Sequence, residues 1–307
     1  MLYYYYIVAC QLIYIIPSLS LYFLEFFYIV LSGDQEFNSA FHRLFIFRAP
    51  ADFIQVLTSL IAFRFPIAGW QGALSFQILA KLGFMISQYS TLFELCLQFL
   101  LSLNRLSAIA TPLSHAKLWN PRSTHLLILL SALMCLIPTF SRIHQEAYYF
   151  PLHGAVVPSL KNREDQSFNS YVSCAIYISF CVACLICNIL AIYVHSKNRK
   201  MQLFEAQPNL ASKVQKNLLI YSCIFTLVII AMTIFQCLLA LSLSSDARNI
   251  VIVLLTLSAD LFALSNPWLL LFLSSTFREK FLKTRRLPRI FASSSTGKLI
   301  EKFINLF

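Results

Sequence analysis

The sequence predicts an all-α integral membrane protein, folded as a bundle of seven transmembrane helices. Of its 307 residues, 58% are hydrophobic and 12% are charged, and the mean hydropathy is +0.70. A soluble domain is about 45–50% apolar and about 25% charged. The apolar residues form seven runs of membrane-spanning length, and Lys and Arg gather in alternate loops. The 28 Phe and 14 Tyr also exclude a disordered chain, which is poor in aromatic residues.

Each of the seven apolar runs is compared in length with the helix needed to cross a bilayer, whose core of about 30 Å needs about 20 helical residues. Their apolarity continues around the helix instead of following one stripe. The strands of a membrane barrel would alternate in units of about 10 residues, and these runs do not. The predicted spans are residues 6–31, 44–63, 76–106, 126–146, 171–195, 217–243 and 250–275. Residues 1–275 are therefore predicted to form the membrane domain, and residues 276–307 a basic tail.

The orientation follows from the Lys and Arg residues of the loops, which favour the cytoplasmic side. With the N-terminus outside, the inner loops and the tail hold 17 of the 24, and the outer segments hold five. We therefore predict an extracellular N-terminus and a cytoplasmic C-terminus. The net charge of +11 is explained by this topology, and no nucleic-acid partner is expected.

The start of the tail, residues 277–283, alternates aromatic and basic residues directly after the last span. This pattern predicts a short amphipathic helix on the anionic inner leaflet of the lipid bilayer. The alternative is an irregular basic tail that obeys the same charge rule.

The cysteines and histidines give no sign of a disulfide framework, a metal or a cofactor. All nine cysteines lie in apolar runs, and the C-x-x-C of Cys184 and Cys187 has no strand pattern around it, which favours simple packing. The six histidines have no metal-binding spacing.

Ionisable residues within spans are costly and suggest function. Arg48 and Asp52 are four residues apart on one helix and can neutralise each other. Glu25 lies near an inner helix end, where it can reach water. Glu94 and Asp260 have no same-helix partner within reach, which makes them stronger candidates.

Depth along the helices, at about 1.5 Å per residue, suggests that Asp52, Glu94 and Asn266 share one level. We expect them to form a polar pocket between the second, third and seventh helices. That pocket would hold a cation, or a proton shared by the two carboxyl groups. The alternative is that separate protonated carboxyl groups serve packing.

Three residues are candidates for contact with a ligand in the outer half of the bundle. Lys81, near the outer end of its span, either reaches the lipid headgroups or faces an outer cavity with Tyr89. In the cavity it would hold an anionic or carbonyl-bearing ligand. Asp260 lies nearer the midplane and is the third candidate.

Two junctions carry recognisable motifs. The third span ends in S-L-N-R-L, which contains Asn104 and Arg105, and is followed by Pro112 and K-L-W. The seventh contains S-A-D-L-F-A-L-S-N-P-W, which includes Asn266 and Pro267. An arginine at an inner helix end offers a fork of donors to a partner. An Asn-Pro step frees a backbone carbonyl, which the Asn amide or water can satisfy, and makes a hinge.

With seven spans and R-F-P-x-x-G-W at residues 64–70, these motifs resemble those of a G-protein-coupled receptor. They are most similar to nematode serpentine chemoreceptors of the gamma and V classes, which the sequence does not separate. The resemblance covers about residues 10–283. It implies a small-molecule ligand, a heterotrimeric G protein, no enzymatic activity, and a place in the plasma membrane, in the cilia of sensory neurons.

The resemblance also assigns switch residues. Asn104 and Arg105 occupy the positions of the D-R of D-R-Y, and Pro112 follows them. Asn266 and Pro267 match the N-P of N-P-x-x-Y, with Leu270 in place of the Tyr. Without an acid at position 104, Arg105 is expected to be held loosely, which implies high basal activity. The sixth span lacks C-W-x-P, and the third lacks the outer cysteine of the usual loop disulfide.

A transporter or ion channel and an intramembrane enzyme are the alternatives. Transporters show paired halves with broken helices, which are not seen, and no protease or hydrolase motif occurs. The expected pocket faces are aromatic and aliphatic with few fixed polar groups, which slightly favours a small apolar ligand over a peptide.

Overall fold

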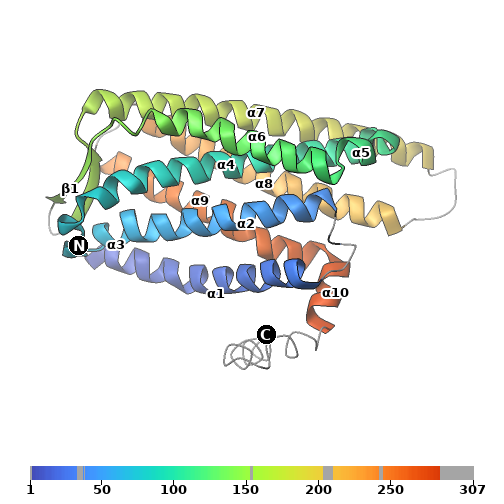
Figure 1. Ribbon diagram of the computed structural model, residues 1–307, viewed down its shortest axis with the longest axis horizontal. Coiled ribbons are helices and arrows are strands. Elements are labelled where there is room, and N and C mark those ends of the chain that lie inside the picture. The colour runs from blue at the N-terminus through green and yellow to red at the C-terminus, as the bar shows by residue number, and fades with distance from the viewer. Residues whose placement is uncertain are drawn as a thin grey trace.

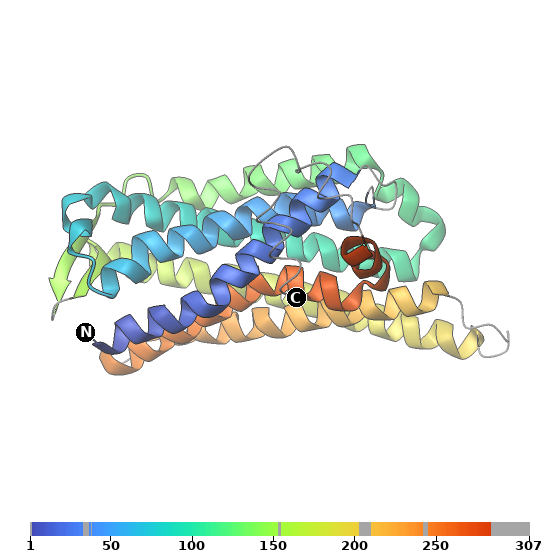
Figure 2. The same cartoon turned by 90° about the horizontal axis from the view of Figure 1, so that it is seen from below.

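The computed structural model describes residues 2–32, 37, 39–152, 155–202, 210–241 and 245–283. The long helices run side by side along the molecule (Figure 1). The start of α1 (Leu2–Ser32) and a β-hairpin lie at one end, which we name the outer end after the charge-based orientation. The short helices α5 (Pro112–Leu118) and α10 (Ser275–Lys283) lie at the other, inner end. Figure 2 shows α1 crossing the bundle obliquely.

Seven of the described helices are long and apolar enough to span a membrane, as the sequence predicts. Most bounds differ from the predicted ones by a few residues, because polar residues at the ends continue the helices. The remaining elements are α2 (Ala40–Thr58), the π-helix η2 (Ser59–Arg64), α3 (Phe65–Ile67), the 3-10 helix η3 (Gln71–Ser75), α4 (Gln77–Ala110), α6 (Pro121–Phe140), β1 (Ala147–Leu152), β2 (Ala155–Leu160), α7 (Arg163–Gln202), α8 (Leu210–Ala240) and α9 (Ser245–Leu273).

Local caps explain where two of the spans begin. The Ser39 side chain accepts a hydrogen bond from the backbone N–H of His42 and caps α2. The Asn120 side chain accepts one from the N–H of Ser123, at 2.8 Å, and caps α6, which has a proline in its first turn.

The fourth span ends earlier than predicted. Residues 126–146 were expected to be helical, but α6 ends at Phe140 and a turn follows. The next apolar run forms β1, which pairs antiparallel with β2 so that Tyr149 lies opposite Pro158. Both runs are short and rich in aromatic or β-branched residues, a composition that favours strands over a helical extension.

Side-chain hydrogen bonds fasten the hairpin to the bundle. Gln77, in the first turn of α4, accepts from the N–H of Tyr149 at 2.6 Å and donates to its carbonyl at 3.3 Å. The Tyr149 hydroxyl donates to the carbonyl of Ala62 at 2.7 Å. All nine cysteines are free thiols. In the described part of the chain, hydrogen bonds thus hold this loop without a disulfide.

We expect Gln77→Ala to loosen the hairpin, because Tyr149 would lose both partners of its backbone groups. Each hydrogen bond contributes about 1 kcal/mol, so the equilibrium constant for opening of the hairpin should rise by at least about one order of magnitude. Hydrogen exchange of residues 147–160 in the purified protein measures this opening. Ser179→Ala, at an exposed position of α7 where the hydroxyl donates to the carbonyl of Ala175 in its own helix, is the control. Unchanged exchange in Gln77→Ala would show that the tyrosine hydroxyl alone fastens the hairpin.

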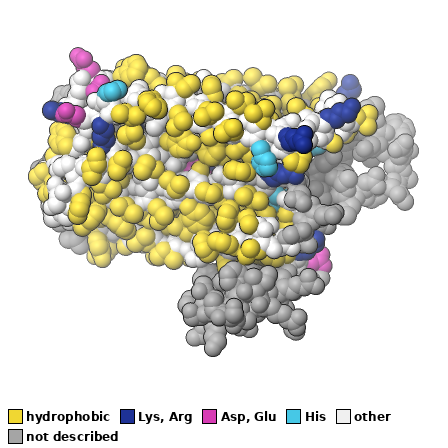
Figure 3. All heavy atoms as spheres, in the orientation of Figure 1, with side chains coloured by type: hydrophobic (Ala, Val, Ile, Leu, Met, Phe, Trp, Pro, Cys, Tyr) yellow, Lys and Arg dark blue, Asp and Glu magenta, His cyan; other side chains and the backbone are white. Residues whose placement is uncertain are grey.

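The surface of the bundle is that of a protein surrounded by lipid. Hydrophobic side chains cover the flank of the bundle, and charged ones gather near its ends (Figure 3). Lipid-facing residues such as Ile13, Ile137 and Leu227 are 66–74% exposed.

The helix predicted after the last span is present as α10, but its aromatic face is not turned toward lipid. Phe277 and Phe281 are buried against Tyr28 of α1, with ring centroids 5.9 and 5.3 Å away, while Arg278 and Glu279 are exposed. This helix therefore packs on the inner end of the bundle. The basic tail after Lys283 and residues 203–209 and 242–244 lie outside the described residues.

Candidate functional site

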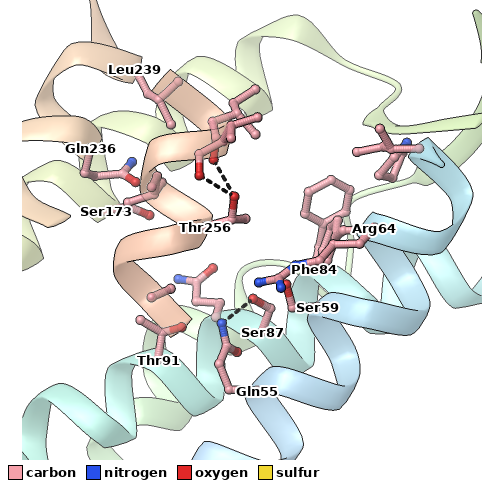
Figure 4. A pocket seen from close by; sticks show the side chains of 18 of the residues that line it. Gln55, Ser59, Arg64, Phe84, Ser87, Thr91, Ser173, Gln236, Leu239 and Thr256 are labelled. Atoms are coloured by element: carbon pink, nitrogen blue, oxygen red, sulfur yellow. Dashed lines mark hydrogen bonds between the residues drawn. The ribbon is translucent and has the colours of Figure 1, made fainter. Parts of the chain in front are cut away.

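A cavity of about 630 Å³ lies among the outer halves of α1, α2, α4, α7, α8 and α9, beside β2. Its size is typical of pockets for small ligands, which are about 300–1,000 Å³. Figure 4 shows Gln55, Ser59, Arg64 and Ser87 on one side, facing Ser173, Gln236 and Thr256 on the other. The cavity therefore lies between the second span and α4 on one side and α7, α8 and α9 on the other.

The wall of this cavity is more polar than the sequence suggested. Half of its lining residues carry polar side chains, more than expected, although most of the wall area is apolar as the sequence suggested. The polar residues come from helices that otherwise face lipid with apolar side chains, and the overall composition of those runs hides them. The polar members are Gln11, Gln55, Ser59, Arg64, Ser87, Gln88, Thr91, Arg142, Gln166, Asn169, Ser170, Ser173, Tyr177, Gln236 and Thr256.

Several of these side chains have atoms that no described group satisfies. The side-chain oxygens of Gln11, Gln55 and Gln88 are buried without a hydrogen-bond partner, and so are the Nε atoms of Arg64 and Arg142. A buried polar atom without a partner carries a free-energy cost of about 1–3 kcal/mol. These atoms belong to residues that line one cavity, so its wall carries several hydrogen-bonding groups.

A buried ion pair closes the outer part of the bundle. Arg64 donates two hydrogen bonds to the carboxylate of Asp260, at 2.9 and 2.5 Å, and the Tyr14 hydroxyl donates a third. Both charged side chains are buried. Asp260 thus has three donors and does not lie free in the cavity as a ligand-binding residue. The sequence places Arg64 in an outer segment, whereas the structure places it within the second spanning helix.

The R-F-P-x-x-G-W motif, residues 64–70, is explained by this arrangement. Arg64 ends η2, and Pro66 lies in the first turn of α3. Gly69 has φ of 111°, in a region that side chains other than glycine rarely adopt. The motif therefore ends the second span with its arginine turned inward and reverses the chain.

The other two ligand candidates lie elsewhere. Neither Lys81 nor Tyr89 is among the described residues that line the cavity. Tyr89 stacks on Phe93 with ring centroids 6.2 Å apart, and Lys81 lies near Glu146, next to the hairpin. Cavity contact is therefore made by other residues of α4, such as Ser87 and Gln88.

Below the cavity, Arg48 is the centre of a buried polar network. Its guanidinium donates to Asp52 at 3.4 Å, to the Gln98 side chain at 2.6 Å and to the carbonyl of Phe262 at 2.8 Å. It also lies between the rings of Phe225 and Phe262, at 4.6 and 4.5 Å. The fully buried cation thereby joins α2, α4, α8 and α9. The local pairing of Arg48 with Asp52 is as the spacing predicts.

Asp52, Glu94 and Asn266 meet around this arginine. Asp52 accepts from the Tyr22 hydroxyl at 2.6 Å and from the Asn266 amide at 2.9 Å, and Tyr221 donates to the Asn266 oxygen. Glu94 lies beside Asp52 and Arg48. The guanidinium is thus the resident cation of the pocket. No group of three or more His, Cys, Asp or Glu in the described part of the chain could hold a metal ion.

Two carboxyl groups of the bundle lack hydrogen-bond partners. One oxygen of Glu94 and both oxygens of Glu25 are buried without one among the described residues. The expectation that Glu25 reaches water is wrong, because its side chain is fully buried at the inner half of α1. A carboxyl group buried in this way, without a hydrogen-bond partner among the described residues, carries a free-energy cost.

At the inner end, Arg105 is buried and faces the ring of Phe41 at 4.5 Å. Its Nε and Nη2 atoms have no described hydrogen-bond partner, and neither has the amide nitrogen of Asn104. No salt bridge among the described residues includes Arg105. The arginine is therefore held by packing under an aromatic ring instead of by an acidic neighbour.

The segment after Arg105 is fixed by the K-L-W motif. Pro112 begins α5, and the buried Trp119 after it donates to the Ser107 hydroxyl of α4 at 2.7 Å. His115 contacts the same hydroxyl at 3.0 Å. Burial and the nearby Arg105 lower the pKa of His115, so it is neutral at pH 7. Together these contacts form an ordered platform beside Arg105.

The Asn-Pro step differs in one respect from expectation. The Asn266 amide donates to Asp52 and to the Tyr22 hydroxyl, so it does not satisfy the carbonyl freed by Pro267. Helix α9 continues through Pro267 to Leu273. Asn266 thus links α9 to α1 and α2, instead of repairing its own helix.

The family is settled by comparison with known proteins. Residues 11–287 match the family of serpentine type 7TM GPCR chemoreceptors called Srv. Among curated proteins, none matches the chain. Of the two classes that the motifs resemble, the match supports class V, and class gamma is not confirmed. Because the match covers most of the 307 residues and the structure has its seven spans, this chain belongs to the Srv family of seven-transmembrane chemoreceptors.

Proposed function

We propose that this receptor binds a small environmental or pheromone-like molecule in the outer cavity and activates a heterotrimeric G protein at its inner end. The observation that carries the proposal is the position of the polar cavity directly above the Arg48 network, in a chain of a chemoreceptor family. Residence in the plasma membrane of sensory cilia is part of the same proposal.

The geometry supports a relay from the cavity to the network. Gln55 and Ser59 line the cavity on the same continuous helix that carries Arg48 and Asp52. Thr256 and Ala259 line it on α9, which carries Phe262 and Asn266. A ligand that moves α9 relative to α2 changes the contacts of Arg48 with Phe262 and of Asp52 with Asn266.

The inner end offers a surface for the G protein. Serines and amides continue the polar contacts toward it: Ser102 lies 3.2 Å from Ser222, which donates to Asn188 at 2.7 Å. When the inner ends of α2 and α4 separate, Arg105 leaves the ring of Phe41 on α2 and exposes its donors to a partner. The ligand shifts this equilibrium by binding the open state more tightly.

Arg105→Ala tests the coupling. We expect G-protein activation in a reporter cell to fall at least tenfold while surface expression stays normal, because the arginine has no ion pair among the described residues whose loss would destabilise the fold. Activation is measured by dissociation of labelled G-protein subunits, both at rest and with a chemical library.

Arg122→Ala, an exposed arginine at the start of α6, is the matched control. Equal signalling by Arg105→Ala and the parent receptor would contradict the proposed switch. A chemically evoked current that persists without G protein would favour the ion-channel alternative.

A further inference from the structure

The outer cavity carries a charge that the protein itself does not neutralise. Its described lining includes Arg64 and Arg142 and no Asp or Glu. Arg64 is paired with Asp260, which lies just behind the wall. No salt bridge among the described residues includes Arg142. The cavity therefore has an excess of one positive charge.

Arg142 is held in place with part of its donor fork free. Its Nη1 donates to the carbonyl of Phe84, which also lines the cavity, at 3.2 Å, while its buried Nε has no partner. Burial lowers the pKa of Arg142 to about 10, so the side chain is still charged at pH 7. A guanidinium with free donors in a half-buried site matches the two oxygens of a carboxylate.

The glutamines of the cavity favour a second kind of group on the same ligand. Gln11 and Gln55 are 4% and 8% exposed, and each has a side-chain oxygen without a partner. Gln88 presents a third such oxygen. Primary amides accept and donate hydrogen bonds, so they pair well with hydroxyl groups, which do both. A purely apolar molecule would leave all of these groups unsatisfied.

We propose that the cavity binds a small hydroxylated carboxylic acid, whose carboxylate pairs with Arg142 and whose hydroxyl groups pair with the glutamine amides. Its apolar part lies against Phe84, Leu92 and Leu239. This inference rests on the proposed function for the role of the cavity, and it adds the chemical class of the ligand. It replaces the sequence-based preference for an apolar ligand.

The first test measures binding without any G protein. The full chain is purified in lipid nanodiscs, and its melting temperature is recorded with ω-hydroxy fatty acids of four to twelve carbons. The methyl ester, the diol and the ω-amino alcohol of each chain length are the matched probes. We expect the acids to raise the melting temperature and the neutral and cationic probes to fail.

Arg142→Gln should weaken the effective acid at least tenfold, and Arg142→Lys should weaken it less, because lysine keeps the charge but loses the fork. Arg122→Gln, far from the cavity, should leave binding unchanged. Equal stabilisation by acid and ester, or an unchanged response of Arg142→Gln, would overturn the proposal.

A second test needs no ligand. Ser87→Cys places a thiol in the cavity wall. The rate at which this thiol is labelled, after subtraction of the labelling of the parent protein, is measured with two methanethiosulfonate reagents. One carries an anionic sulfonatoethyl group and the other a cationic trimethylammonioethyl group. Relative to a free thiol, we expect the anionic reagent to be favoured at least threefold, and Arg142→Gln to abolish this preference. If no compound stabilises the receptor, the ratio of the labelling rates with the anionic and the cationic reagent decides whether the proposal stands. A preference for the cationic reagent, or a ratio that Arg142→Gln leaves unchanged, would overturn the proposal.

The two proposals fail separately. Acids that bind in nanodiscs but never activate a G protein would count against coupling alone. Amines or apolar compounds that activate the reporter would count against the carboxylate alone.

Discussion

Arg48→Met is expected to destabilise the receptor by about 3–5 kcal/mol, because it removes one partner of a buried ion pair. Asp52 would keep its hydrogen bonds from Tyr22 and Asn266 but lose the cation that balances it. Gln98 and the carbonyl of Phe262 would each lose a charged donor. The methionine fills a similar volume between the two aromatic rings, so the loss reports mainly on charge.

Thermal unfolding of the purified protein measures this effect, followed through the reactivity of the buried thiols of Cys135 and Cys184. Glu94→Gln is the control, since it has nearly the same shape and Glu94 already has an unpartnered oxygen. We expect this control to stay within about 1 kcal/mol of the parent, in the range of ordinary mild substitutions.

A comparison of Arg48→Met with the parent protein also tests whether the guanidinium occupies the place of a mobile cation. In the parent protein, sodium in place of a large organic cation should not change the melting temperature. In Arg48→Met, Asp52 and Glu94 become available to an ion, and sodium should restore part of the lost stability. A parent that responds to sodium as strongly as Arg48→Met would show that the arginine is not the resident cation.

The spans could be predicted because they depend on local information. Twenty apolar residues in a row are enough to identify a helix that lipid surrounds, and the bilayer fixes its length. The ion pair of Arg48 and Asp52 could also be predicted, since residues four apart share a helix face. The hairpin could not, because the hydrogen bonds that fasten it to the bundle join Tyr149 to Gln77 and Ala62, which are far away in the chain.

The candidate site was harder to predict than the fold. Asp260 carried a visible signal as an acid within a span, but its partner Arg64 is 196 residues away in the chain. The sequence showed Arg64 at the edge of an apolar run, where it read as a loop residue. Likewise, the polar lining of the cavity comes mostly from scattered Gln, Ser, Thr and Asn residues on six helices. Each is unremarkable alone, and only packing brings them together.

Asp260→Asn is expected to cost about 3–5 kcal/mol, as much as Arg48→Met, because Arg64 would remain buried without a counter-charge. Arg64→Met leaves the opposite charge unbalanced and should be similarly harmful. The double variant with Arg64→Met and Asp260→Leu removes both charges and should recover most of the stability. Recovery on this scale is expected because apolar residues of similar volume often replace a buried ion pair without loss.

The matched control is the ion pair of Lys161 and Glu146 at the outer end. Its distance of 2.6 Å is as short as that of the buried pair, but its side chains are 70% and 69% exposed. Lys161→Met should change stability by less than about 1 kcal/mol, since water already solvates both groups. The comparison of the two variants separates the effect of burial on stability from the effect of the contact distance. If Lys161→Met and Asp260→Asn had equal effects, or if the double variant were no more stable than either single one, the pair would not act through its buried charge.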